Sequence, residues 1–334
     1  MYKIQSLWNQ GMCIPKPQFG EANVADQSGR VIIVTGGYAG IGYELCKILY
    51  RKNGTVYIAG RSKEKFDEAE ARIRAEIPTS SGSLTFLQLD LANLDAIKAS
   101  ADDFLSKEKR LDVLVNNAGV MFPPDGSKTE AGHELQIATN GLGPFLFTQY
   151  LLPVLRSTAA SSPQNSVRVT WATSLAIDLM ASGPGMEFNE EGSPVTLKTT
   201  RQTMVRAKFL TCSSLLSSQR NSRRMAFSAS HGTLGTYGLT CIDTLAELRR
   251  LSRNQKAALF SPDLGVIPPL FAGWSSSVTM DDCLAGEIII PWDRKHTPRQ
   301  ALLDGLKPKP DGGESLSRQF WSWCHRQTSL TESS

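Results

Sequence analysis

The sequence predicts a doubly wound α/β fold in which a parallel sheet of seven strands carries helices on both faces. Short apolar runs recur along the chain, segments with helical periodicity separate them, and a glycine-rich turn joins the first run to the first helical segment. Alternation of this kind favours a parallel sheet, because right-handed crossovers place the helices on its two faces. Ligands of such sheets bind beyond the carboxyl ends of the strands.

The seven expected strands are short runs rich in apolar and β-branched residues. They cover residues 31–34, 56–59, 84–87, 113–115, 167–171, 225–227 and 288–290. The first helix is expected just after the first strand, where Ile41, Leu45, Ile48 and Leu49 fall on one helical face. Two stretches, 181–199 and 260–282, show neither periodicity, and we expect irregular loops there that shape a substrate pocket.

The domain organisation follows from these elements. Residues 1–28 precede the first strand and form an N-terminal extension. Residues 29–328 are expected to form a single domain, in which 237–328 is the substrate-loop region. The polar end, 329–334, is expected to be disordered.

Composition excludes several classes of function. The net charge of +4 is spread over 36 basic and 32 acidic side chains, which gives no tract for nucleic acid. The six cysteines are scattered without ligand spacing, so no metal site is expected. The first twenty residues hold no long apolar core, and we therefore expect no membrane span and a cytoplasmic protein.

The glycine-rich turn is the first candidate binding site. Gly36, Gly40 and Gly42 stand between strand and helix, with Ile41 opening the apolar face of that helix. Glycine lets the backbone turn sharply and approach a diphosphate, whose charge then meets the N–H groups of the helix terminus. In isolation such a turn also fits plain chain reversal. The order strand, turn, helix favours a dinucleotide.

Basic side chains after the second strand indicate which dinucleotide binds. Arg61 ends that strand and Lys65 lies just beyond it. An acidic residue at this position hydrogen-bonds a ribose hydroxyl, whereas a guanidinium accommodates a 2′-phosphate. The pattern favours NADP(H) over NAD(H). The alternative is an ordinary solvated basic helix start.

Four motifs together resemble the short-chain dehydrogenase/reductase family, over residues 29–236. They are the turn from Thr35 to Gly42, Asp90-Leu91, the run Asn116-Asn117-Ala118-Gly119, and Asn140. The resemblance implies a Rossmann-type fold, an adenine contact from Asp90 beside Leu91, and a cofactor pocket lined by Asn117, Ala118 and Gly119. The C-terminal part is similar to fungal members related to retinol dehydrogenases.

The resemblance also implies a catalytic set. Asn140 helps hold a water near a lysine, Ser174 hydrogen-bonds the substrate oxygen, and Lys208 holds the nicotinamide ribose. The position four residues before Lys208, which holds a tyrosine in the family, is Met204. A thioether can neither supply a proton nor bear the charge of a developing alkoxide.

The sixth strand is followed by a second departure, because the family has Pro-Gly where this chain has His231-Gly232. Gly232, Leu234 and Thr236 are the residues implied to contact the nicotinamide carboxamide. His231 titrates near neutral pH and is either a substitute acid or a histidine packed beside the cofactor.

Three functions remain open on the sequence. The first is an NADP(H)-dependent oxidoreductase, with an atypical proton donor, acting on CH–OH or carbonyl groups of a lipophilic small molecule in secondary metabolism. The second is a non-redox cyclase or isomerase, because Met204 makes the pocket drier. The third is a catalytically silent NADP-binding protein. The resemblance further implies a homodimer through the helices that contain Asn140 and Lys208.

Overall fold

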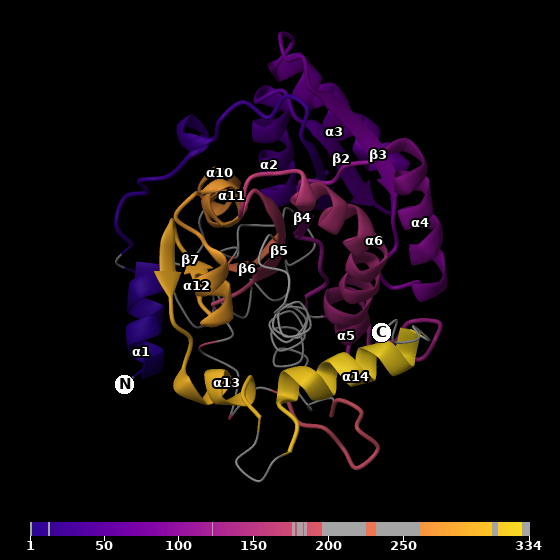
Figure 1. Ribbon diagram of the computed structural model, residues 1–334, viewed down its shortest axis with the longest axis vertical. Helices are drawn as coiled ribbons and strands as arrows, with labels where there is room; N and C mark the ends of the chain where they lie inside the picture. Colours follow the sequence, from indigo (N-terminus) through magenta and orange to yellow (C-terminus); the bar gives the residue numbers. More distant parts are fainter. Residues whose placement is uncertain are drawn as a thin grey trace.

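The structure is a computed structural model in which one sheet runs through the whole fold (Figure 1). It describes residues 2–12, 14–121, 123–175, 178, 183, 186–195, 225–231, 261–308 and 313–328. The strand order is β3-β2-β1-β4-β5-β6-β7-β8. The chain winds outward from β1 in both directions, as a doubly wound fold requires.

Each strand is short and, apart from β8, parallel to its neighbours. The strands are β1 (Val31–Thr35), β2 (Thr55–Gly60), β3 (Ser83–Gln88), β4 (Val113–Asn116), β5 (Val167–Thr173), β6 (Met225–His231), β7 (Ile288–Ile290) and β8 (Arg294–His296). The predicted fold class is confirmed, but the strand count of seven is wrong. The eighth strand is three polar residues that fold back on β7, and so short a polar run gives no period to detect.

Helices cover both faces of the sheet. On one face, α2 (Gly40–Arg51), α3 (Lys63–Glu76) and α11 (Ile267–Trp274) pack on Ile32 and Val34 of β1. On the other, α4 (Leu94–Lys107), α6 (Gly143–Ala160) and α14 (Leu316–Thr328) share a core with Val31 and Ile33. Successive residues of a strand face opposite sides, which explains why β1 is buried at every position and apolar from Val31 to Val34.

The helical segment around Asn140 is continuous. It starts with α5 (Leu135–Ile137), passes through one π-helical turn (Ala138–Leu142) and continues as α6. Asn140 therefore lies within a helix, as the resemblance implies. The π turn widens the helix at the asparagine, and such turns are frequent at functional sites.

The predicted irregular loop at 260–282 is wrong. This stretch forms α10 (Pro262–Gly265), α11 and the start of α12 (Met280–Leu284), and α13 (Gln300–Gly305) follows further on. Prolines stand in the first turns of α10 and α11. Proline is favoured there because the first helical N–H groups have no partner within the helix. The prolines mark helix starts in this stretch.

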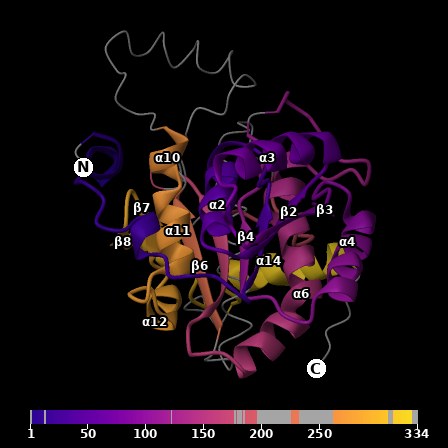
Figure 2. The ribbon, with the colours of Figure 1, turned by 90° about the horizontal axis from the view of Figure 1, so that it is seen from above.

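The N-terminal segment lies beside the edge of the sheet formed by β7 and β8 (Figure 2). It contains α1 (Tyr2–Leu7), a π-helical turn (Trp8–Met12) and a short 3-10 helix (Glu21–Asn23). The Arg294 guanidinium donates to the carbonyl oxygen of Asn9 at 2.6 Å. The Asp293 carboxylate accepts the backbone N–H groups of Gln18 and Phe19. These bonds attach the extension to the strand pair β7 and β8.

Candidate cofactor and catalytic site

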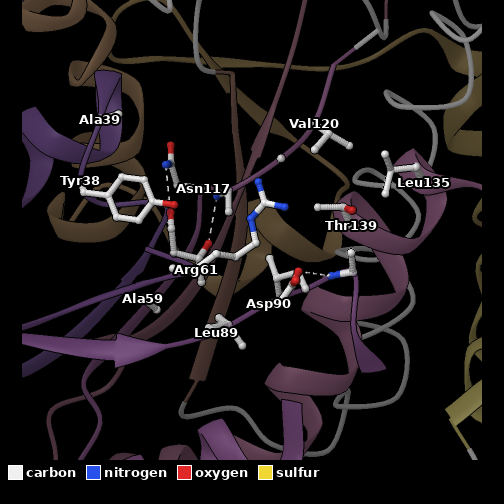
Figure 3. A pocket seen from close by; sticks show the side chains of 17 residues that line it. Tyr38, Ala39, Ala59, Arg61, Leu89, Asp90, Asn117, Val120, Leu135 and Thr139 are labelled. Carbon is white, nitrogen blue, oxygen red and sulfur yellow. Dashed lines mark hydrogen bonds between the residues drawn. The ribbon is translucent and has the colours of Figure 1, made fainter. Parts of the chain in front are cut away.

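A cavity of about 350 Å³ lies where the strand order reverses, between β1 and β4 (Figure 3). Carboxyl ends of the central strands and the segment after β3 form its wall. The residues that line it are Thr35, Gly36, Tyr38, Ala39, Ala59, Gly60, Arg61, Leu89, Asp90, Leu91, Ala92, Asn117, Ala118, Gly119, Val120, Leu135 and Thr139. Seven of the predicted cofactor residues are in this set: Gly36, Arg61, Asp90, Leu91, Asn117, Ala118 and Gly119.

The glycine turn has the shape of a diphosphate cradle. Gly36 and Gly40 adopt positive φ angles of 66° and 55°, a region open to glycine. A Cβ on Gly42 would lie 2.5 Å from the Gly36 carbonyl oxygen and 2.7 Å from Nδ2 of Asn117. The start of α2 therefore approaches the turn as closely as backbone atoms permit. Ala39 at the N-cap offers no side-chain acceptor, so the first N–H groups of α2 remain suited to a bound anion.

The ends of β1 and β4 are joined by side-chain hydrogen bonds. Nδ2 of Asn117 donates to the Thr35 carbonyl oxygen at 3.0 Å, and Oγ1 of Thr35 accepts the Ala118 N–H at 2.9 Å. Gly36 N–H donates to the Ala59 carbonyl oxygen of β2 at 2.7 Å. These bonds hold the floor of the cavity rigid. Gly40, Ile41 and Gly42 do not line the cavity. They shape the turn and, through buried Ile41, anchor it in the core.

Asp90 and Leu91 form the wall beyond β3. One carboxylate oxygen of Asp90 accepts the Ala92 N–H at 2.9 Å, which closes a tight turn and fixes the side chain at the cavity wall. The other carboxylate oxygen of this cavity-lining side chain is a suitable acceptor for an exocyclic amine of a base.

The two predicted basic residues differ in position. Arg61 lines the cavity, and within the described residues its guanidinium takes part in no ion pair. Lys65 is exposed in the first turn of α3, outside the lining set, and its backbone N–H donates to Ser62 Oγ. The structure therefore brings Arg61 into the site but not Lys65.

Asn140 is fully buried and holds the segment that follows β4. Its Oδ1 accepts the Val120 N–H and its Nδ2 donates to the Val120 carbonyl oxygen, both at 2.8 Å. This pair of bonds fixes Val120 against the cavity. The side chain of Asn140 thus positions the wall next to Gly119, a role that spacing alone did not indicate.

Ser174 directly follows the carboxyl end of β5 and is partly exposed. The strand end places it on the side of the sheet where ligands bind. Lys208, Met204, Gly232, Leu234 and Thr236 lie outside the described residues, and their predicted roles remain predictions.

Sequence reasoning missed several lining residues. Val120, Leu135 and Thr139 come from the segment after β4 and from the helix that carries Asn140. Ala59, Gly60 and Leu89 belong to strand ends or lie just past them. The rule that ligands bind beyond the carboxyl ends could have found the latter group once the strand ends were located.

A buried carboxylate, Asp178, lies four residues after Ser174 and ties three distant segments together. Its Oδ2 accepts Ser6 Oγ at 2.6 Å and Gln10 Nε2 at 2.9 Å, and lies 3.0 Å from Nε2 of His296. Because serine and histidine both contact the carboxylate, with no histidine between it and the serine, the cluster is not a nucleophilic triad. It attaches the N-terminal extension near the strand end that carries Ser174.

Asp178→Ala is expected to lower the free energy of unfolding by about 3 kcal/mol, because removal of a buried charge leaves its partners without their acceptor. Chemical denaturation of the variant measures the loss. Asp102→Ala, which removes a carboxylate from an exposed pair with Lys98, is the matched control and should cost less than about 1 kcal/mol. Equal losses of unfolding free energy in the two variants would show that the buried cluster around Asp178 stabilises the fold no more than an exposed ion pair does.

Within the described part of the chain, no helix combines the length and apolarity that a membrane crossing needs. No group of three or more histidine, cysteine, aspartate or glutamate side chains is arranged there to hold a metal ion.

Fold and site together define a doubly wound α/β protein with a cavity at its switch point. Residues 30–164 match the family described as short chain dehydrogenase. The chain is 38% identical over 333 residues to a short-chain dehydrogenase/reductase of Phomopsis amygdali, covering 97% of this chain and 96% of that one. The chain belongs to the short-chain dehydrogenase/reductase family.

Solved structures share the fold. An uncharacterized protein of Mycobacterium paratuberculosis is similar with a TM-score of 0.63 and 22% identity, over 93% of this chain and 98% of that one. RhlG of Pseudomonas aeruginosa, solved as an NADP active-site complex, is similar with a TM-score of 0.56 and 21% identity, over 80% and 96%. At these identities the likeness supports the fold alone.

Proposed function

We propose that the protein is an NADP(H)-dependent oxidoreductase that acts on a carbonyl or alcohol group of a lipophilic small molecule. The observation that carries the proposal is the cavity between β1 and β4. A glycine turn without room for a Cβ at Gly42 forms one wall, and the Arg61 guanidinium, which makes no ion pair with the described residues, extends into the cavity. The complex of RhlG with NADP supports a nicotinamide cofactor on this fold.

The described residues fit such a cofactor. The close approach of Gly36 and Gly42 leaves backbone N–H groups for the diphosphate, and Asp90 provides an acceptor for the adenine amine. Arg61 provides paired donors for a 2′-phosphate. When bound, the nicotinamide supplies or accepts the hydride. The protein's part is to hold it against the substrate and to manage the proton.

We assign proton transfer to the substrate oxygen to residues that follow β5 in the chain. In the proposal Ser174 donates a hydrogen bond to the substrate oxygen, and Lys208 holds the cofactor ribose and bears positive charge near the oxygen. Asn140 acts by fixing the wall segment at Val120. Met204 supplies no proton, so we propose a slow enzyme whose atypical donor is Lys208 or a water beside it.

The direct test is to add NADPH to purified protein with a panel of ketones and aldehydes, and to follow NADPH absorbance and binding heat. Loss of NADPH in step with alcohol formation supports the oxidoreductase. Substrate change without NADPH loss assigns the cyclase or isomerase function instead, and binding without either assigns the silent one. A role in secondary metabolism, a cytoplasmic location and a homodimer remain predictions.

Arg61→Ala is expected to weaken NADPH binding by about 10- to 100-fold, the effect of losing a charge-assisted contact of about 1.5–3 kcal/mol, and NADH binding by less than about twofold. Calorimetric titration with both cofactors measures the two affinities. Lys65→Ala is the matched control, since it removes a nearby positive charge that does not line the cavity. Equal weakening of NADPH and NADH by Arg61→Ala would contradict the assignment.

A further inference from the structure

We propose that Tyr38 determines cofactor specificity, its phenol group donating a hydrogen bond to the 2′-phosphate that Arg61 also contacts. The proposal rests on the proposed NADP(H) function and extends it to a residue inside the glycine turn. The turn serves the diphosphate through backbone groups, so a large phenol at this position needs a separate explanation.

The ring of Tyr38 has a defined place at the end of β2. An ideal Cβ built on Gly60 would lie 2.2 Å from Cε1 of Tyr38, 3.0 Å from Cζ and 3.1 Å from the hydroxyl oxygen. The ring therefore occupies the space that a side chain on Gly60 would fill. Gly60 and Tyr38 form a matched pair, in which the absent Cβ of one makes room for the ring of the other.

This place is next to the guanidinium. Arg61 directly follows Gly60, and both Tyr38 and Arg61 line the cavity (Figure 3). The ring packs against the core cluster that contains Ile58 and Ile41. One side of the Tyr38 ring thus packs against the core, while its hydroxyl group lies beside Gly60, the residue directly before Arg61. A rigid ring loses little entropy when its hydroxyl meets a ligand.

The charges at this place favour a phosphate. Of the charged side chains, Arg61 and Asp90 line the cavity, and Asp90 already closes its own turn with Ala92 N–H on the β3 side. The neighbouring Lys63 is paired with Asp67. A phosphate next to Arg61 offers several acceptor oxygens, and a neutral phenol that donates to an anion makes a hydrogen bond about twice as strong as one to a neutral group. A ribose hydroxyl offers no such gain.

The test compares two ligands that differ by the 2′-phosphate, adenosine 2′,5′-bisphosphate and 5′-AMP, in calorimetric titrations. Tyr38→Phe keeps the ring and removes the donor. It should weaken the bisphosphate about tenfold, the loss of one charge-assisted hydrogen bond, and leave 5′-AMP within about twofold. Tyr43→Phe is the control, because the Tyr43 hydroxyl on α2 is buried without a hydrogen-bond partner among the described residues and lies outside the cavity lining.

A double-mutant cycle locates the contact. If both side chains bind the same phosphate, the losses from Tyr38→Phe and Arg61→Ala are not additive. Gly60→Ala gives an independent measurement, since displacement of the ring should lower the preference for the bisphosphate while thermal unfolding reports whether the fold persists. Unchanged bisphosphate affinity in Tyr38→Phe, or equal losses for both ligands, overturns the proposal for Tyr38. If the unaltered protein binds neither the bisphosphate nor NADPH, the proposed function itself fails.

Discussion

Met204→Tyr raises kcat for carbonyl reduction by about 10²- to 10⁴-fold, the usual contribution of a positioned general acid, and changes KM by far less. Hydride delivery to a carbonyl produces an alkoxide, and the family resemblance implies a phenol four residues before Lys208 whose pKa the ammonium group lowers. The gain is expected on kcat because the proton moves in the transition state, and a group that acts only there leaves ground-state binding unchanged.

Steady-state kinetics with NADPH and a reactive aldehyde measure this prediction. Met204→Leu is the matched control, since it keeps an apolar side chain of similar volume and should leave kcat within about threefold. Lys208→Met added to the tyrosine variant should remove most of the gain, because the phenol then loses its charged neighbour. An unchanged or lower kcat in Met204→Tyr would indicate a proton route that does not pass through this position.

A check of the reading frame accompanies that experiment. The third base of the Thr203 codon and the first two of the Met204 codon spell TAT, a tyrosine codon, when that third base is T. In the same shifted frame, the third base of the Ala207 codon and the first two of the Lys208 codon spell AAA, a lysine codon, four codons later, when that third base is A. Sequencing the transcript over this segment determines whether the cell makes methionine or tyrosine at this position. It therefore shows which of the two forms, methionine or tyrosine, is the natural protein.

Local patterns predicted several residues that line the cavity between β1 and β4, because each signal acts on its own neighbours. Each of these signals is one continuous segment of the chain: a buried strand of β-branched residues, the glycine turn, or the run from Asn117 to Gly119. The switch point follows from the strand order. Arg61 was predicted for the same reason, since it directly follows β2. Lys65 shares its charge and neighbourhood but sits in the first turn of α3, and side-chain direction on a helix is decided by its phase relative to the core.

What the sequence did not predict depends on contacts between distant segments. The attachment of Ser6 and Gln10 to Asp178 joins residues more than 160 positions apart, and no period in either segment indicates it. The match between Gly60 and Tyr38 is likewise a packing relation across two strand ends. In 260–282 the lack of periodicity predicts a loop, but the structure has short helices there, with prolines in their first turns, where this residue type is favoured.

Gly42→Val is expected to weaken NADPH binding by at least about 100-fold and to lower the melting temperature, and it tests the premise on which the whole assignment depends. The added Cβ would lie 2.5 Å from the Gly36 carbonyl oxygen, so the turn and the start of α2 must separate. Overpacking of this kind costs about 1–3 kcal/mol, and the displaced N–H groups no longer meet the diphosphate.

Gly20→Val is the matched control, because the space around a Cβ at Gly20 is empty to 4 Å and its φ of −169° suits any residue. Titration with NADPH and thermal unfolding are measured on both variants. A Gly42→Val protein that stays folded and binds NADPH as tightly as the Gly20→Val protein would show that the turn reverses the chain without holding a diphosphate.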